Sequence, residues 1–506
     1  MYYYGITIGP IMSTIQLSTK PLGLWFSSFL FSEFSKSICK ALKKGHGPSE
    51  SFQLFVPCVD SDAERRKDTA VGKYHDRIIF ESDKEIHCIQ ACIESAIENL
   101  QEKISDKSGR NIVDLNKYLV YQLACLNSEN CADNINVIQL FSTILDSMEL
   151  NTSLIPGSEV TKMRNLVSQN ERLTSLKLFQ DYSDSLQQEL SLRLPDGGVK
   201  DLKIICRNET SHESSLDSIK SEKYYVILRA DGDNVGGKLM QMTNKQVIAC
   251  SKVLLSYGDE VAQKIKDYGG SLLYAGGDDL LAIVPLKQYG EDTILSLCKE
   301  VNQLFKRRLA AAGIGIQEND VSLSFGLGIF YYKFPLFEAL GQSLKQLFGV
   351  AKSEKVGKNA VAIYAQKHSG QVIQMIVKQD WVENSEGIYD TLLSHLDTEN
   401  NSVLYHLMNN ANLFKFAIEK FLTNPESKIV DNLFTNYFDH LSQQDGDIQY
   451  NIGFIKSIIR YLQENPVVIE QIEQRKEGLT NQMKTDIVYD YIIQILRFRK
   501  LLVEGD

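Results

Sequence analysis

The sequence predicts an α+β protein, because runs with strand-like and helix-like periodicity alternate along the chain. An apolar run at 224–230 is followed by apolar residues at helical spacing over 244–267, and then by two short apolar runs that flank a Gly-Gly-Asp-Asp tetrapeptide at 276–279. The next elements are expected to be a helix, a strand, a helix and a strand at 293–312, 321–331, 336–351 and 360–364. This βαββαβ order predicts a ferredoxin-like domain.

The tetrapeptide Gly276-Gly277-Asp278-Asp279 is predicted to form the tip of a β-hairpin. Its glycines let the backbone bend, or approach a phosphate closely. Its adjacent carboxylates favour a hard divalent cation. Gly-Asp pairs are also common in turns that bind nothing, so the tetrapeptide alone leaves both interpretations open.

A second acidic cluster, Asp231-Gly232-Asp233-Asn234, follows the strand-like run directly. The first strand and the hairpin are neighbours in a ferredoxin-like sheet, so Asp231 and Asp278 are expected on either side of one ion site. An aspartate at a strand end is often only a helix N-cap, but the two clusters together favour a two-metal centre for Mg²⁺ or Mn²⁺. The predicted metal ligands are Asp231, the Gly232 carbonyl, Asp278 and Asp279. Nucleotide contacts are expected from Gly232, Asp233, Asn234, Gly236, Gly276 and Gly277.

Two lysines precede the last predicted strand of this domain. Lys352 ends a helix, and Lys358 lies in a Gly-Lys-Asn turn. Either lysine can reach a triphosphate as a point charge. The alternative is that both are solvated surface residues.

These segments together resemble the second palm domain of the large subunit of type III CRISPR effector complexes. The resemblance rests on the two acidic clusters, on Ser324-Phe325-Gly326 with the residues that follow, and on residues 351–359. Residues 4–11, with 19–25 and an apolar helix to about residue 42, resemble the first, catalytically degenerate palm of the type III-B (Cmr) subgroup. The hairpin alone also occurs in diguanylate cyclases, so the pair of palms makes the resemblance specific.

The resemblance implies an ATP-using palm polymerase, a nucleotidyltransferase activated when a complex that carries guide RNA binds target RNA. Its product would be an adenylate second messenger, either cyclic oligoadenylate or AMP joined to S-adenosylmethionine, and the sequence leaves this choice open. Ser324 is expected to face the base, and a second nucleotide is expected between the palms near residues 9–10 and a 19–25 loop. The residues expected to be catalytic are Asp231, Asp278 and Asp279.

Two features depart from the family pattern. The chain opens directly on the first palm strand, and its His-Asp dipeptide, His75-Asp76, is isolated. We therefore expect no HD nuclease domain and no DNase activity, and we interpret His75 as a structural or surface residue. The family's zinc-binding cysteine pairs are also missing from the sequence, which has nine cysteines and no CxxC motif.

Length and composition predict a multidomain, cytoplasmic protein without membrane contact, because no apolar run approaches the ~20 residues of a membrane helix. The net charge of -10 argues against holding nucleic acid alone, so guide and target RNA are expected to be held mainly through the other subunits of a complex. The expected domains are a first, degenerate palm at 1–130, a mostly helical middle domain and connector at 131–218, a catalytic palm at 219–370 and a C-terminal helical bundle at 371–506.

Two alternatives from other classes remain. A stand-alone nucleotidyl or diguanylate cyclase would share the hairpin, although the two-palm layout argues against it. A non-catalytic nucleotide-binding scaffold would be expected to have lost its acidic tip. Retention of all three aspartates favours turnover.

Overall fold

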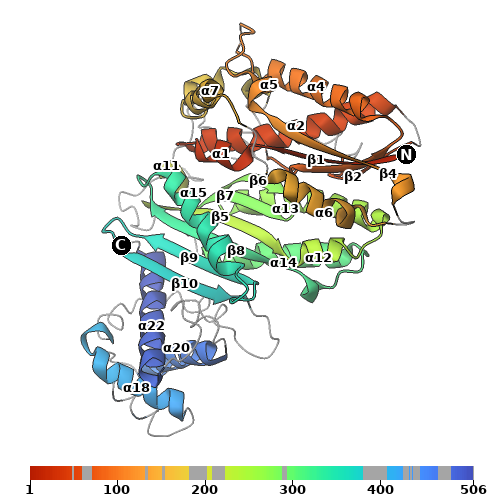
Figure 1. The fold of residues 1–506 in the computed structure, drawn as a ribbon. Helices are drawn as coiled ribbons and strands as arrows, with labels where there is room; N and C mark the ends of the chain where they lie inside the picture. Colours follow the sequence, from red (N-terminus) through yellow and green to blue (C-terminus); the bar gives the residue numbers. More distant parts are fainter. Residues whose placement is uncertain are drawn as a thin grey trace.

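The computed structural model contains two β-sheets that lie one above the other, with C-terminal helices below the second sheet (Figure 1). The structure describes residues 1–47, 51–59, 71–106, 108–131, 135–150, 154–181, 202–207, 223–287, 293–379, 407–424, 432, 436, 445–464 and 480–504. Of the predicted middle domain and connector at 131–218, residues 132–134, 151–153, 182–201 and 208–218 lie outside these ranges. Within them, no helix is both long and apolar enough to cross a membrane.

The first sheet has four antiparallel strands in the order β2-β3-β1-β4. Its elements are β1 (Tyr2–Gly9), α2 (Pro21–His46), β2 (Phe52–Val56), β3 (Arg77–Ser82), α4 (Ile86–Lys103) and β4 (Val120–Asn127). This is the predicted βαββαβ order, so the first palm is ferredoxin-like. The expected loop at 19–25 is wrong, because α2 already begins at Pro21, where the fixed φ of proline suits the first helical position.

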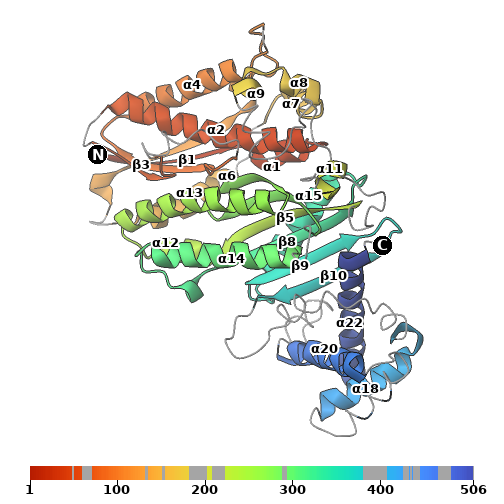
Figure 2. The same ribbon diagram turned by 180° about the vertical axis from the view of Figure 1, so that it is seen from behind.

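The second sheet has six strands in the order β10-β9-β8-β5-β7-β6. Its elements are β5 (Tyr224–Asp233), α13 (Asn244–Asp267), β6 (Ser271–Gly276), β7 (Asp279–Pro285), α14 (Ile294–Ala311), β8 (Ser322–Tyr331), β9 (Ala360–Gln366) and β10 (Val372–Lys378). The four strands β8-β5-β7-β6 and the two helices form a ferredoxin-like unit, and α13 and α14 cover one face of it (Figure 2). The predicted α+β class with two ferredoxin-like palms is therefore confirmed.

Local sequence explains where the elements of the second palm begin and why they pack. Thr243 accepts a hydrogen bond from the Gln246 backbone N–H and starts α13 with a capping box. The central strand β5 is buried from Tyr224 to Ala230, which matches its continuous apolar run. On the other face of the sheet, α15 (Leu336–Leu344) continues into η4, a π-helix at Lys345–Ala351.

A glycine lets η4 approach the sheet. A Cβ atom on Gly326 of β8 would collide with the backbone of Leu347 and of Ser343. Only a residue without a side chain fits there, so the Ser-Phe-Gly motif brings the π-helix onto β8. Since η4 ends one residue before Lys352, this contact also positions the lysine.

The two palms meet along the edge of the second sheet. Gly72 of the first palm forms a parallel bridge with Tyr274 of β6, and its carbonyl accepts a 2.7 Å hydrogen bond from the Ala275 N–H. A second contact between the palms involves Asn136, whose side-chain amide donates to the carbonyls of Leu239 and Met242, at 2.8 and 2.5 Å. Asn136 also caps α6 (Val137–Glu149), which packs on β1, so α6 links the two sheets.

The described part of the region predicted to be mostly helical at 131–218 contains α6, α7 (Gly157–Val167) and shorter helices. One expectation about secondary structure is wrong. The region from about 371 was expected to be helical, but Val372–Lys378 form β10, which pairs with β9. Within the predicted C-terminal helical bundle, α22 (Asn481–Glu504) contacts the outer strand β10, because the Tyr491 hydroxyl donates to the Ile376 carbonyl (Figure 1).

Candidate active site

The hairpin tip and the end of β5 meet at one edge of the second sheet. Gly276 pairs with Asp279 across the tip, and Gly277 has a φ of 68°, which glycine adopts without strain. A Cβ on Gly232 would collide with the carboxylate of Asp278, so the two acidic clusters are in contact. The lack of a side chain at residue 232 is what allows this approach.

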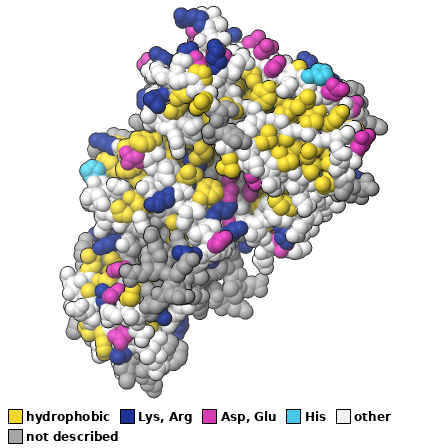
Figure 3. Space-filling model, viewed as in Figure 1, with side chains coloured by type: hydrophobic (Ala, Val, Ile, Leu, Met, Phe, Trp, Pro, Cys, Tyr) yellow, Lys and Arg dark blue, Asp and Glu magenta, His cyan; other side chains and the backbone are white. Residues whose placement is uncertain are grey.

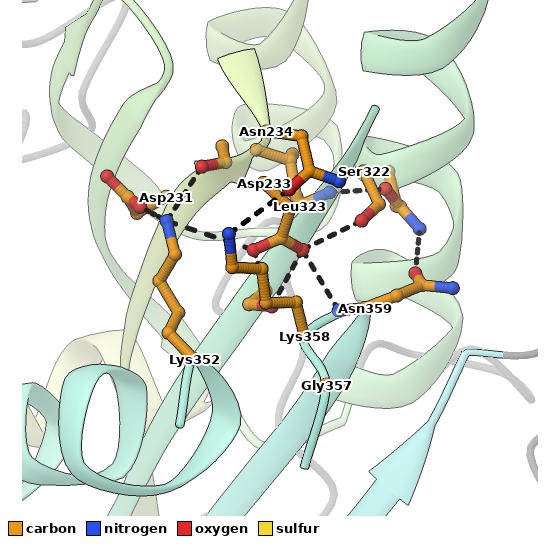
Figure 4. Close-up of polar contacts among 12 residues, drawn as sticks. Asp231, Asp233, Asn234, Ser322, Leu323, Lys352, Gly357, Lys358 and Asn359 are labelled. Atoms are coloured by element: carbon orange, nitrogen blue, oxygen red, sulfur yellow. Dashed lines mark hydrogen bonds and ion pairs between the residues drawn. The ribbon is translucent and has the colours of Figure 1, made fainter. Parts of the chain in front are cut away.

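Lys352 lies between the predicted metal-binding oxygens. Its ammonium group forms an ion pair with Asp231 and donates a 2.7 Å hydrogen bond to the Gly232 carbonyl oxygen (Figure 4). Burial, and secondarily the neighbouring Lys358, lowers the pKa of Lys352 to about 8. The side chain is thus a partly desolvated cation held by a carboxylate and a carbonyl.

Asp233 has a structural position. Its side chain is 1% exposed and accepts hydrogen bonds from the hydroxyls of Ser322 and Ser324, at 2.7 and 2.8 Å, and from the Asn359 N–H at 3.0 Å. Burial raises the pKa of Asp233, although these bonds oppose the shift. Ser324 is fully buried and donates its hydroxyl to Asp233. The expected contacts of Ser324 with a base and of Asp233 with the nucleotide stay predictions.

The turn before β9 faces the same loop. Lys358 and Asn359 both have positive φ values, 63° and 46°, which non-glycine residues rarely adopt. Asn359 is tied to Asp233, and Lys358 donates a 3.1 Å hydrogen bond to the side chain of Asn234 (Figure 4). Asp233 therefore fixes the turn that carries Lys358 against the loop after β5. Gly236 lies one turn further, in the short helix α12 (Val235–Leu239).

A cleft of ≈490 Å³ lies between the palms and contains the whole hairpin tip. The first palm contributes Lys73, His75, Asp76 and Arg77 to its wall, and Gly236 of the second palm also lines it. Figure 3 shows acidic and basic side chains gathered between the upper and lower parts of the molecule, with hydrophobic side chains on either side.

Sequence reasoning assigned His75 to structure or surface and gave Asp76 no role, so it missed that both residues line the cleft. They lie just before β3, at the end of the connection between β2 and β3. In the topology of the two palms, this connection corresponds to the β6–β7 hairpin that carries Asp278 and Asp279. That topological correspondence is the signal that would have found them. Burial, and then Arg77, lowers the pKa of His75 to about 4, so its imidazole is neutral at physiological pH.

The carboxylates of the cleft repel one another. Desolvation, and then Asp279, raises the pKa of Asp278 to about 7. Asp279 keeps contact with solvent in the cleft, yet the surrounding protein and then Asp76 also raise its pKa to about 7. Burial, and secondarily Glu149, raises the pKa of Asp76. A bound cation would relieve this repulsion.

The residues present fit a divalent metal ion. Among the described ranges, no three His, Cys, Asp or Glu side chains already converge as a ligand set. The Lys352 ammonium nevertheless occupies a cation position between Asp231 and the Gly232 carbonyl, and Asp278 touches the same glycine. These hard oxygen donors are the ones that Mg²⁺ and Mn²⁺ prefer.

A second cavity of ≈440 Å³ lies behind the hairpin. Ile11, Met12 and Ile15 of α1 (Ile11–Gln16) line it, directly after the Gly9-Pro10 pair near which a second nucleotide was expected. No residue of the 19–25 segment contributes to its lining.

Two family models match the chain. Residues 224–362 match the model described as Cas10/Cmr2, second palm domain. Residues 3–107 match the model described as CRISPR-associated protein Cmr2, N-terminal. Each match falls within one of the two ferredoxin-like units, and together they confirm the resemblance predicted from the motifs.

Individual relatives agree with the family models. The chain is 28% identical over 231 residues to the Cmr2 subunit of the CRISPR system Cmr of Pyrococcus furiosus, a match that covers 40% of this chain and 25% of that protein. The chain thus spans about a quarter of the length of that curated relative. Among solved structures, it is similar to chains of the type III-B Cmr-beta complex in the apo state and bound to cognate target RNA. The match to the apo-state chain has a TM-score of 0.53 and 11% identity, and it covers 97% of this chain and 81% of that chain. The match to the RNA-bound chain has a TM-score of 0.52 and 10% identity, and it covers 97% of this chain and 82% of that chain.

Proposed function

Because the chain contains a Cmr2-type N-terminal domain and a Cas10/Cmr2 second palm domain, we propose that it is the signalling subunit of a type III CRISPR complex. In this proposal it transfers adenylate from ATP by metal-assisted palm chemistry when the complex binds target RNA. The single observation that carries the proposal is the contact between Asp278 and Gly232, which gathers three predicted metal ligands beside Lys352.

Asp231, the Gly232 carbonyl, Asp278 and Asp279 would hold Mg²⁺ or Mn²⁺. The metal would lower the pKa of an attacking hydroxyl and neutralise charge on the triphosphate. The protein supplies the oxygen ligands on rigid elements, since Asp231 ends a central strand and Asp278 lies at a hairpin tip.

Lys352 and Lys358 are the cations that we assign to the triphosphate. When ATP and metal bind, Lys352 would exchange Asp231 for a phosphate oxygen, which the ammonium of lysine binds as a point charge. A hydroxyl oxygen of the acceptor attacks the α-phosphorus of ATP, the bond from that phosphorus to the bridging oxygen breaks, and pyrophosphate leaves. The hydroxyl proton passes to solvent in the cleft.

Two acceptors are compatible with this reaction, the two that the family resemblance implies. A second ATP would lead to cyclic oligoadenylate, and S-adenosylmethionine would give an AMP conjugate. The cleft and the cavity lie on two sides of Asp279, so donor and acceptor have separate spaces next to one carboxylate. Guide and target RNA, and the other subunits of the complex, are proposed partners that hold the chain and control its turnover.

The test is mass spectrometry of products from the assembled complex. The complex, with guide RNA, is incubated with ATP and Mg²⁺ or Mn²⁺, with and without matching target RNA and with and without S-adenosylmethionine. We expect an adenylate product that requires target RNA, and its mass identifies the acceptor.

The matched control is the double variant Asp278→Ala/Asp279→Ala in an equally assembled complex, which should form no product. Activity of the isolated chain without target RNA would instead support a stand-alone cyclase. No product from an intact, target-bound complex would leave only a nucleotide-binding scaffold.

A further inference from the structure

Strand β4 forms a long, regular edge of the first sheet. All eight residues of Val120–Asn127 pair with β1 without a shift in register. β4 is the last strand of this sheet, and no other described strand pairs with its outer side. An edge strand of this length presents a row of backbone N–H and C=O groups that can pair with a further strand. The outer edge of β4 is therefore a candidate surface for strand addition.

The other three edges of the two sheets have features that hinder such pairing. Strands β2 and β6 each have a shift in register against their neighbour, between Leu54 and Val56 and between Leu272 and Tyr274. Both strands also contact the other palm, since β2 packs against α13 and Tyr274 of β6 bridges to the first palm. Helix α22 packs against β10. By contrast, β4 has no proline, no lysine and no register shift, the usual means of preventing edge-to-edge pairing.

The second palm shows how the equivalent edge is completed. Strands β4 and β8 correspond to each other, because each is the last strand of its ferredoxin-like unit and pairs antiparallel with the first strand. In the second palm, β9 pairs in parallel with the outer side of β8, and β10 pairs with β9. The described part of the first palm has no strand at the position of β9. A strand from another protein would complete the first sheet in the same way.

One face of β4 lies beside helix α6. Ala124 pairs with Gly5 of β1, and a Cβ atom on Gly5 would collide with the ring of Phe141 of α6. The flank of α6 that lines the cleft carries Ile138 and Ser142. The opposite flank carries three half-buried apolar side chains at four-residue spacing, Leu140, Ile144 and Met148. Because α6 contacts β1, β3 and β4 and the cleft is lined by β3, this opposite flank lies toward β4.

The other face of β4 is also apolar at its surface. Tyr121, Leu123 and Cys125 alternate with the residues that face α6, and all three are half-buried. Figure 3 shows hydrophobic side chains gathered on the upper right of the molecule, in the area where Figure 1 labels α6 and β4. A strand that pairs with β4 would therefore meet apolar side chains on both of its faces. Such a strand is expected to be a continuous apolar run.

A carboxylate lies near each end of β4. Burial, and then Glu94 of α4, raises the pKa of Tyr121, so the Glu94 carboxylate is close to the first end. At the other end, the Asn127 side chain donates a 3.4 Å hydrogen bond to Glu129. Two copies of β4 paired antiparallel about a twofold axis would bring Glu94 of one copy near Glu129 of the other. This repulsion and the net charge of -10 disfavour a second copy of the chain, whereas Lys or Arg at the ends of a partner strand would be attracted.

We propose that the outer edge of β4 is an interaction surface for an extended segment of another protein, which joins the first sheet as an additional strand. The segment that fits is a continuous apolar run of about five or six residues with Lys or Arg at its ends. Main-chain hydrogen bonds to β4 would supply affinity, and the apolar side chains would supply specificity. The surface lies outside the cleft, so the proposal does not depend on the proposed catalysis.

Fluorescence anisotropy with the full chain tests this assignment. The probe is a fluorescein-labelled peptide with five alternating Val and Ile residues between two pairs of Lys. The matched control is the same peptide with alternate backbone amides N-methylated, which removes the donors needed to pair with β4. We expect the control peptide to bind at least about 10-fold more weakly. Hydrogen–deuterium exchange should show that the probe slows exchange within residues 120–127 and leaves exchange in β10 unchanged.

Three variants connect binding to this edge. Leu123→Lys places a charge on the edge strand and should weaken probe binding about 10-fold or more. Val372→Lys places the same charge on an exposed apolar position of β10 and should leave binding unchanged. The double variant Glu94→Lys/Glu129→Lys changes two exposed residues, so folding is retained. It should weaken the probe about 3-fold to 10-fold and should favour a peptide in which Glu replaces the terminal Lys residues.

The proposal is overturned if the probe does not bind, if the N-methylated peptide binds equally well, or if Leu123→Lys has no effect in a chain that thermal melting shows to be folded. Sedimentation velocity of the full chain alone should show a monomer. A dimer that Leu123→Lys dissociates would assign the edge to a second copy and would also overturn the proposal. Each of these failures leaves the proposed function intact if the assembled complex still makes an adenylate product.

Discussion

The ammonium group of Lys352 is paired with the carboxylate of Asp231, across the point where a metal ion and a triphosphate would meet. This ion pair compensates a buried charge while the site has no ligand. It also keeps the lysine close to the place where the phosphates would arrive. The same side chain thus serves the site without ligand and the site with ATP bound, and its burial lowers the pKa of Lys352.

Lys352→Met is expected to raise the KM for ATP by about 10-fold, because one phosphate-binding charge is lost, worth roughly 1.4 kcal/mol. Lys352→Arg should restore part of the affinity. Initial rates of adenylate formation by the assembled complex measure both. Lys264→Met is the matched control, since Lys264 pairs with Glu300 on the outer helices. A fall in kcat with an unchanged KM would instead assign Lys352 to the transition state alone.

Asp233→Ala is expected to destabilise the protein by about 2–4 kcal/mol, because two hydroxyls and the Asn359 N–H lose their acceptor. Ser324→Ala removes one donor and should cost about 1 kcal/mol. Thermal and urea unfolding measure these differences. If Asp233→Ala abolished metal binding without loss of stability, Asp233 would be a metal ligand and its structural assignment would be wrong.

Asp278→Asn is expected to stabilise the ligand-free protein at pH 8 but not at pH 4. The folded-state pKa of Asp278 is raised to about 7, above an unfolded value of about 3.9. The protonated form is therefore favoured by folding, and this stability is lost as the pH rises from about 4 to about 7. The gain at pH 8 should be on the order of 2–4 °C in Tm.

The control for this pH dependence is Asp320→Asn, at an exposed aspartate whose pKa is lowered by hydrogen bonds from Gln317 and Lys238. This change should lower the Tm slightly at pH 8. Added Mg²⁺ should raise the Tm of the wild type at pH 8 more than that of Asp278→Asn. An equal gain for Asp278→Asn at both pH values would contradict the electrostatic explanation.

Gly326→Ala is expected to destabilise the second palm by roughly 1–3 kcal/mol and to weaken ATP binding, because the new methyl group would push η4 and Lys352 away from β8. Gly341→Ala is the matched control. Gly341 lies inside α15 with open space around it, so alanine should stabilise the helix by about 0.5–1 kcal/mol. Melting curves and ATP titrations distinguish the two glycines. Equal effects would mean that the close approach of η4 has no role.

The second palm was largely predictable from sequence. Its strands carry continuous apolar runs, its helices have caps and a 3.6-residue period, and its tip is a glycine turn between two such runs. The topology then required Asp231 and Asp278 to be neighbours, and the structure brings their segments into contact. Local pattern and fold order were sufficient for this part of the site.

Other features depend on information that no local pattern contains. Strand β4 is half-buried along its whole length, so it lacks the alternation of a one-sided strand. Asp231 and Asp233 look alike in the sequence, because both lie at the end of β5. Asp233 becomes a buried hydrogen-bond acceptor because Ser322 and Ser324 of the neighbouring strand β8 donate to it. The position of His75 in the cleft requires knowledge of how the two palms dock.

The bridge between Gly72 and Tyr274 has a consequence for how the molecule is made. The two residues are 202 positions apart (274 minus 72), so the first palm is synthesised well before its docking edge exists. Contacts this distant in sequence form late and slowly. Until β6 emerges and folds, the docking face of the first palm is exposed, and a half-made chain with such a face is prone to aggregate. The cleft around the predicted catalytic hairpin therefore forms only after both palms have been synthesised and have docked.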